Sequence, residues 1–430
     1  MNRVLTLAAS AIALCAAPAA AQDFVITNAT VVTGDGSEPI ASGVVVVDDG
    51  RVVYTGPQAG AGAFDTATVY DVGGAWVTPG LVATVTNLGL SDVSAVSESN
   101  DIRPGSSPFN AALDVAPAIN PSSQHILVHR AAGITRAATV TAPARSIFGG
   151  QGAIIDLGAD GQPVTRARAF QMVAFGESGA RLAGGSRVAT YAAFANALYE
   201  AQAVAAGRWD AESAMLTRAD AEALVPVVKG EQSLYMAVER AADIRSVLAL
   251  KQSFPRLDLV LVGVSEGWLV AREIAAAGVP VIADGLDDLP GAFEELAATQ
   301  SNIGRMAKAG VKVAINASAM ENPRNLNQYA GNLVSLTRIP GADGLTWGQA
   351  FAAISSVPAE ISGLKGRAGV LAPGAMGDVV VWDGDPLEVG SVPTRVFIDG
   401  VEQPLDSHQS RLRDRYRDLD ESDLPKAYDW

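Results

Sequence analysis

Two carboxylates stand where acid–base chemistry could be carried out. Glu239 and Asp284 each follow a short apolar run with the composition of a buried strand. Two carboxyl groups whose surroundings push their pKa values apart can act as acid and base, or can hold a hard cation. The structural alternative, which we favour, pairs Glu239 with Arg240 or Arg324 and makes Asp284 the cap of a helix that begins at 287–290.

Imidazole and thiol chemistry have little material to work with, because the chain contains three histidines and one cysteine. His125 and His129 are four residues apart, a spacing that can bind zinc on one helix face, but no Glu lies between them. We interpret this pair as an ordinary helix face and His408 as a surface residue of a polar C-terminal tail.

The composition excludes several classes of protein. Of the 430 residues, 49% are hydrophobic and 18% are charged, which is too apolar for a disordered chain. The formal net charge of −15 argues against a nucleic-acid binder, which needs a basic face for phosphates.

The first 21 residues have the pattern of a secretory leader. Arg3 precedes the apolar run 4–17, and small residues lead to a cleavage site expected after Ala21. The run is too short to span a bilayer, and no later stretch qualifies. We therefore expect a periplasmic or secreted protein without a membrane span. It would lack cysteine, because Cys15 lies in the leader.

Segments at the two chain ends share a β signature. A β-branched run at 44–47 meets the turn pair Asp49-Gly50 and a second such run at 52–54, a pattern typical of a hairpin. Strand-like runs return near 379–382 and 395–398. We expect one small β-sandwich built from residues 22–80 and 367–404, followed by a charged tail at 405–430.

The middle, residues 81–366, alternates short apolar strands with amphipathic helices, as in an α/β protein. Several strand–helix–strand units in fewer than 300 residues predict a (β/α)8 TIM-like barrel, with a doubly wound open sheet as the alternative. The expected strands are 81–88, 134–140, 233–238, 258–263, 280–284 and 311–316; the expected helices are 187–206, 218–228, 240–253, 267–277, 291–309, 346–356 and 358–364.

Two further segments are expected to be loops near the mouth of this barrel. The glycine-rich segment 148–152 lacks the Lys-Ser/Thr of a phosphate loop, and we interpret it as a loop crossing the barrel top. The segment 322–325 carries Arg324, which could bind an acidic ligand, although a plain surface loop is favoured.

Motifs in a characteristic order resemble the amidohydrolase superfamily, particularly its imidazolonepropionase-like branch. The segment 74–82, GAWVTPGLV, resembles the start of the barrel in that family, and 374–383, GAMGDVVVWD, resembles its closing segment. Four pieces between them also lie in a family-like order: 132–136, 240–244, 310–314 and 358–364. The resemblance implies a barrel paired with a β-sandwich formed by both chain ends.

The same resemblance implies a divalent metal such as zinc, but the usual ligand positions hold other residues. The two histidines expected on the first strand are replaced by Val85 and Asn87. Later strands end near Glu239, in Val262-Gly263-Val264-Ser265, and at Asn316 and Ser318, where the family places two histidines and an aspartate. Catalytic zinc takes three protein ligands and lowers the pKa of its water to about 7. We therefore expect no metal or other cofactor, and count Asn87, Asn316, Ser318 and Arg324 as candidate binding residues.

Three functional hypotheses follow. In the first, the protein is an exported amidohydrolase relative without its metal site, which binds a small molecule at the barrel mouth or acts as a partner subunit in a homo-oligomer or beside a metal-competent paralogue. In the second, it hydrolyses non-peptide carbon–nitrogen bonds in cyclic amides, N-acyl amino acids or dipeptides, using a relocated carboxylate site at Glu239 and Asp284. In the third, it is a solute-binding or scaffold protein. The sequence leaves open whether it is an enzyme.

Overall fold

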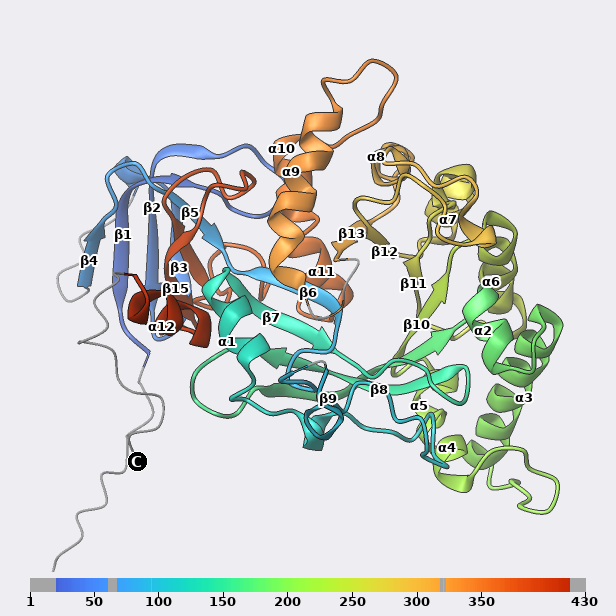
Figure 1. The fold of residues 1–430 in the computed structure, drawn as a ribbon. Coiled ribbons are helices and arrows are strands. Elements are labelled where there is room, and N and C mark those ends of the chain that lie inside the picture. Colours follow the sequence, from blue (N-terminus) through green and yellow to red (C-terminus); the bar gives the residue numbers. More distant parts are fainter. Residues whose placement is uncertain (1–20, 61–67, 94, 318–319, 321, 418–430) are drawn as a thin grey trace, which may run out of the picture.

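The chain folds around two eight-stranded sheets, one drawn from its two ends and one from its middle (Figure 1). The computed structural model describes residues 21–60, 68–93, 95–317, 320 and 322–417 of the 430. The predicted leader, residues 1–21, thus lies outside the described residues except for Ala21. Within the part described, no helix is long and apolar enough to cross a membrane.

The sheet from the chain ends runs in the order β16-β15-β14-β5-β1-β2-β3, with β4 beside β1. Its hairpins turn at Asp49-Gly50 and Asp399-Gly400, where all four residues have positive φ. The type I′ turn requires this backbone, so the Asp-Gly hairpin signature is confirmed. Its strands are β1 (Phe24–Val31), β2 (Ile40–Asp48), β3 (Arg51–Pro57), β4 (Thr68–Asp71), β5 (Trp76–Pro79), β14 (Val379–Trp382), β15 (Pro393–Ile398) and β16 (Val401–Glu402).

This sheet curls around its own core. Arg51 at the start of the edge strand β3 bridges to Met376, which lies just before β14, four places away in the strand order. The enclosed residues come from both chain ends, and the Phe24 and Phe397 rings stack with centroids 4.2 Å apart.

The second sheet forms a barrel in the order β13-β12-β11-β10-β9-β8-β7-β6. The predicted TIM-like barrel with a further β unit is thus confirmed, with one strand reversed: β8 is antiparallel to both neighbours. The strands are β6 (Leu81–Thr86), β7 (Ile134–Thr139), β8 (Phe148–Asp156), β9 (Val164–Ala174), β10 (Ser233–Val238), β11 (Leu259–Gly263), β12 (Val281–Asp284) and β13 (Val313–Asn316).

The expectation of a loop at 148–152 was wrong, because these residues begin β8. The glycines serve close packing here. A Cβ on Gly152 would lie 2.1 Å from a ring carbon of Phe170 on the neighbouring strand β9. The sequence prediction also missed β9.

The barrel is closed by a short segment between its two end strands. Val82 of β6 donates a backbone hydrogen bond to Ile354 (3.0 Å), and Ile315 of β13 donates to Ala353 (2.9 Å). These acceptors lie just after α10, so a helix C-terminus joins the two edges of the sheet.

Helices cover the outside of the barrel (Figure 1). The expected helix 291–309 is instead a 3₁₀ turn at Phe293–Glu295 followed by a separate α8. The buried Glu294 carboxylate accepts a hydrogen bond from Arg187, and this bond holds the 3₁₀ turn against the start of α3. The helices are α1 (Gln124–Ala131), α2 (Gly176–Leu182), α3 (Arg187–Ala205), α4 (Arg218–Ala223), α5 (Val225–Lys229), α6 (Ala241–Ser253), α7 (Ala271–Ala277), α8 (Asn302–Lys308), α9 (Leu326–Leu336), α10 (Trp347–Ala352), α11 (Ser356–Ile361) and α12 (His408–Arg415).

A buried arginine joins the two sheets. Arg136 of β7 is 1% exposed and forms a two-pronged bond to Asp378, which lies just before β14: Nε to Oδ2 at 2.8 Å and Nη2 to Oδ1 at 2.9 Å. Asp399 (2.7 Å) and Asp156 (3.8 Å) complete the group. Burial acts to raise the pKa of Asp378, but Arg136 outweighs it and holds that pKa below its usual value.

Asp378→Asn should therefore lower the free energy of unfolding by about 3 kcal/mol, since removing one partner of a buried ion pair leaves charge uncompensated. Urea unfolding followed by circular dichroism measures this. The control is Glu222→Gln, which breaks the exposed Arg218–Glu222 pair and should cost less than about 0.5 kcal/mol. Equal losses in the two variants would contradict the structural role given to Arg136.

Candidate functional site

Polar residues gather where the parallel strands β10 to β13 end. Glu239 directly follows β10, Ser265 lies two residues beyond β11, and Asp284 and Asn316 end β12 and β13. In a barrel of parallel strands these ends share one rim, where barrel enzymes carry their active sites. We call this rim the barrel mouth.

Strand alternation directs two of these side chains inward. Ile282 and Ala314 belong to the hydrophobic cluster inside the barrel, so Asp284 and Asn316, two positions further on, face the same interior. They are paired in register, and Thr84 Oγ1 donates to Asn316 Oδ1 at 3.5 Å. Asp284 Oδ1 also accepts from the backbone of Leu286 at 3.3 Å, so part of its role is to shape the turn after β12.

Glu239 is hydrogen-bonded to Ser265. The Ser265 backbone N–H and hydroxyl both donate to Glu239 Oε2, at 2.9 and 2.8 Å. The hydroxyl also lies 3.4 Å from Asp287 Oδ2. Since a hydroxyl has one proton, it can serve one of the two carboxylates at a time. Asp287 was not among the site residues predicted from the sequence. The only signal for it is that it lies three residues after Asp284, the acidic residue that ends β12.

The carboxyl groups here hold their protons more tightly than in water. Burial raises the pKa of Glu239 to about 7, against the two bonds from Ser265 and with the help of nearby Glu295 and Asp287. Burial also raises the pKa of Asp287 to about 6, and the negative charges of Asp284 and Glu295 contribute to this rise. The mouth is therefore acidic and poised to titrate near neutral pH.

Strained backbone accompanies this arrangement. Val85 and Val264 have φ of 46° and 62°, a region that β-branched residues rarely occupy. Gly263, with φ of 88°, makes room for the carboxylate, because a Cβ there would lie 1.9 Å from Glu239 Oε1.

The predicted site residues do not all meet. Asn87 is buried, and its backbone N–H donates to Met320. Ser318 lies outside the described residues. Arg324 is exposed and lines a different pocket with residues of α1 and β15, away from the Glu239 cluster.

The ion pairs expected for Glu239 are not those of the structure. Arg240 pairs with Asp243 at 3.1 Å, and Asp243 also binds Arg187 at 2.8 Å. Glu239 instead takes its hydrogen bonds from Ser265, which frees Arg240 to hold the start of α6.

Comparison with known proteins identifies the family. Residues 155–401, which run from the end of β8 to β16, match the model of the amidohydrolase family. The chain belongs to that family. It is also 43% identical over 60 residues to amidohydrolase tasK of Hapsidospora irregularis, and 42% identical over 55 residues to an imidazolonepropionase of Rhizorhabdus wittichii. These matches cover 14% and 13% of this chain, and only 6% and 14% of the two relatives.

Solved structures share the fold. An amidohydrolase from Thermotoga maritima superposes with a TM-score of 0.77 at 23% identity, over 88% of this chain and 99% of that one. A zinc-bound adenosine deaminase from Xanthomonas campestris gives 0.51 at 15% identity, over 93% and 98%. The local similarity to imidazolonepropionases agrees with the branch to which the sequence motifs pointed.

Several side chains at the barrel mouth already have partners within the protein or lack a donor atom. Val85 offers no donor atom, and Asn316 Oδ1 already accepts from Thr84. The Glu239 oxygen that faces Ser265 is likewise engaged twice. Among the described residues, no three His, Cys, Asp or Glu side chains are grouped so that they could hold a metal ion.

The paired histidines lie elsewhere in the amidohydrolase, on α1. His129 is fully buried, its Nδ1 lies 2.6 Å from the His125 carbonyl, and its Nε2 has no partner among the described residues. Burial lowers the pKa of His129 to about 4, so the ring is neutral at pH 7. His125 and His129 lie on one helix, as predicted. His408 is exposed at the start of α12, also as expected.

The raised pKa of Glu239 predicts that this carboxyl group makes stability fall as pH rises. Between its unfolded value near 4.5 and its folded value of about 7, the folded chain holds a proton that the unfolded chain has lost. Relative to Glu239→Gln, the free energy of unfolding of the wild type should fall by on the order of 2 kcal/mol from pH 4.5 to 7.5. Urea unfolding at each pH measures the difference between the two proteins.

Taking that difference cancels the titration of groups common to both proteins. His129 acts in the opposite direction, because its lowered pKa makes stability fall as pH drops from 6.5 to about 4. A pH-independent difference between wild type and Glu239→Gln would show that Glu239 does not titrate in this way.

Proposed function

We propose that this exported amidohydrolase relative binds a small molecule at its barrel mouth and does not catalyse the family's metal-assisted hydrolysis. The observation that carries the proposal is the hydrogen-bonded pair of Glu239 and Ser265 where the resemblance implies two metal-binding histidines. Val85 supports it, since it occupies the first of the two histidine positions that the resemblance implies on the first barrel strand, and an apolar side chain there cannot ligate an ion.

The charge of the mouth indicates the class of ligand. Asp284, Asp287, Glu239 and Glu295 act on one another there, whereas Arg324, the predicted partner for an acidic ligand, lines another pocket. A carboxylate ligand would be repelled by these groups, so neutral or cationic amides fit better than N-acyl amino acids.

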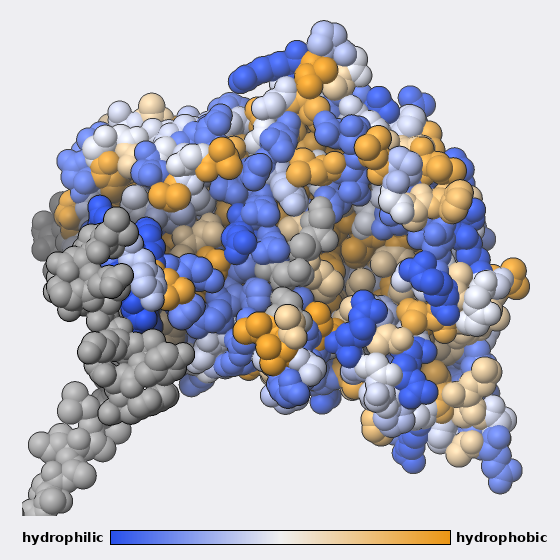
Figure 2. Space-filling model, in the orientation of Figure 1, coloured by the Kyte–Doolittle hydropathy of each residue, from blue (hydrophilic) through white to orange (hydrophobic). Residues whose placement is uncertain are grey.

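The rim next to this cluster is apolar. The segment after β12 exposes Leu289, Phe293 and Leu296, which are 82%, 83% and 67% accessible. On the face shown in Figure 2, hydrophobic residues likewise form several groups over the barrel half of the molecule, at the right. Such a rim suits a ligand with an apolar portion or a partner subunit.

Metal content and thermal shift test this proposal together. We expect no near-stoichiometric zinc, iron or manganese in the purified protein, and a rise in melting temperature with a neutral cyclic amide such as hydantoin. A ligand at 100 times its Kd adds about 2.7 kcal/mol of apparent stability. Asp287→Asn should change that shift, and Glu222→Gln should not. Stoichiometric metal together with chelator-sensitive hydrolysis would contradict the proposal.

A second candidate, hydrolysis of non-peptide carbon–nitrogen bonds without a metal, is favoured by the placement of Glu239, which follows β10 at the barrel mouth and whose burial raises its pKa to about 7. A carboxylate with that pKa is well matched to take a proton from an attacking water at neutral pH. Asp284, which faces the same interior, is the candidate that would protonate the leaving nitrogen.

Turnover of cyclic amides, dipeptides and N-acyl amino acids distinguishes the two functions. Under the hydrolase function, the rate should rise with pH through about 7 and fall by at least about 100-fold in Glu239→Gln and in Asp284→Asn. Full activity in both variants excludes this site. Absence of turnover with all three classes, alongside a thermal shift, favours binding alone.

A further inference from the structure

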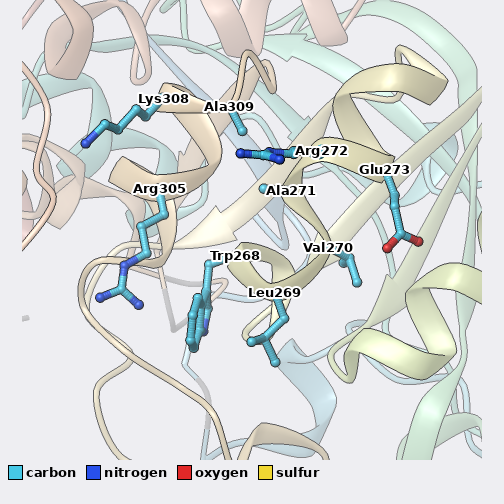
Figure 3. A pocket seen from close by; sticks show the side chains of 9 residues that line it. All are labelled: Trp268, Leu269, Val270, Ala271, Arg272, Glu273, Arg305, Lys308 and Ala309. Atoms are coloured by element: carbon cyan, nitrogen blue, oxygen red, sulfur yellow. The ribbon is translucent and has the colours of Figure 1, made fainter.

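The outer side of the barrel carries a second pocket, apart from the Glu239 cluster. It lies among η4 (Gly267–Val270), α7 and α8, and has a volume of about 520 Å³ (Figure 3). That volume falls within the range of small-molecule sites, roughly 300–1,000 Å³. None of its lining residues belongs to the Glu239 cluster.

Positive charge is concentrated in this pocket. Arg272, Arg305 and Lys308 line it, and Glu273 is its only acidic lining residue. Glu273 is already bound by Arg245 at 2.8 Å, and Asp343 binds both Arg305 and Lys308, at 3.3 and 3.2 Å. Four cations thus face two carboxylates, on a chain whose net charge is −15.

Among the cations that line this pocket, Arg272 is the one whose hydrogen-bond donors can bind a ligand. Its side chain is exposed and makes no hydrogen bond or ion pair with any other residue in the described ranges, whereas Arg305 and Lys308 share Asp343. A guanidinium carries five donors in a plane that suits a carboxylate or a phosphate.

An aromatic ring is fixed beside these cations. The Trp268 indole N–H donates to the Ala297 carbonyl at 2.8 Å, and its backbone N–H donates to Asn302 Oδ1 at 2.9 Å. The Arg305 guanidinium lies over the ring, 4.5 Å from its centroid. Leu269, 46% exposed, adds apolar lining, and Figure 3 shows its side chain close to the Trp268 ring.

We propose that this pocket binds a small organic anion with a planar aromatic portion. Arg272 holds the carboxylate or phosphate group, while Trp268 and Leu269 contact the ring. The site is independent of the function proposed for the barrel mouth, because it shares no residue with that cluster.

Binding of 2-naphthoate to the full chain tests the proposal, with 2-naphthylmethanol as its neutral counterpart and 2-naphthyl phosphate as the phosphate form. Isothermal titration calorimetry at low ionic strength should show that both anions bind, that the alcohol does not, and that added salt weakens binding. Arg272→Gln should weaken binding about tenfold, the share of one charge-assisted hydrogen bond.

Arg338→Gln is the matched control, because it removes the same charge from an exposed arginine just after α9, which lines no part of this pocket. It should leave the affinity unchanged. Trp268→Phe should abolish the quenching of tryptophan fluorescence by the bound anion. No binding by the wild type, equal binding of the alcohol, or equal losses in Arg272→Gln and Arg338→Gln would each overturn the proposal.

Discussion

The architecture depends on one buried charge. Arg136 lies in the wall of the barrel, yet its main partner, Asp378, belongs to the other sheet and lies 242 residues away in the chain. A guanidinium taken out of water needs acceptors around it, and for Arg136 these are carboxylates, most of them outside the barrel, so the two sheets must keep their relative placement for this charge to be satisfied. Close packing supports the same junction, since a Cβ on Gly133 would lie 2.9 Å from the Trp382 ring.

At the barrel mouth another ionisable group, the Glu239 carboxyl group, is buried, but it is not compensated by an opposite charge. Glu239 is removed from water without a basic partner among the residues that the structure describes, and two hydrogen bonds from Ser265 do not offset the loss of hydration. The carboxyl group therefore holds a proton near neutral pH. Protonatable acids at this rim therefore bear directly on which ligands the mouth can accept.

More of the fold than of the candidate site could be predicted from the sequence. The Asp49-Gly50 pair indicated the hairpin of β2 and β3, and the alternation of apolar strands with helices indicated the barrel. The glycines at 149, 150 and 152 were read as a loop because glycine is common in loops. In the structure all three lie in β8, and each is closely approached by another segment: Gly149 by Thr141 and Pro143, Gly150 by Leu113, and Gly152 by the Phe170 ring, 18 residues away. Local patterns cannot report which side chain will fill the space that a glycine leaves.

By itself, the sequence determined which chemical groups are available: few histidines, no cysteine after Cys15, and carboxylates at the ends of strands. Only the tertiary structure decided how those groups are paired. It placed Ser265 between Glu239 and Asp287, paired Arg240 with Asp243, and placed Arg324 in another pocket. The physical reason is that hydrogen bonds and ion pairs act over a few ångströms, and those distances arise only when residues far apart in the chain are packed together.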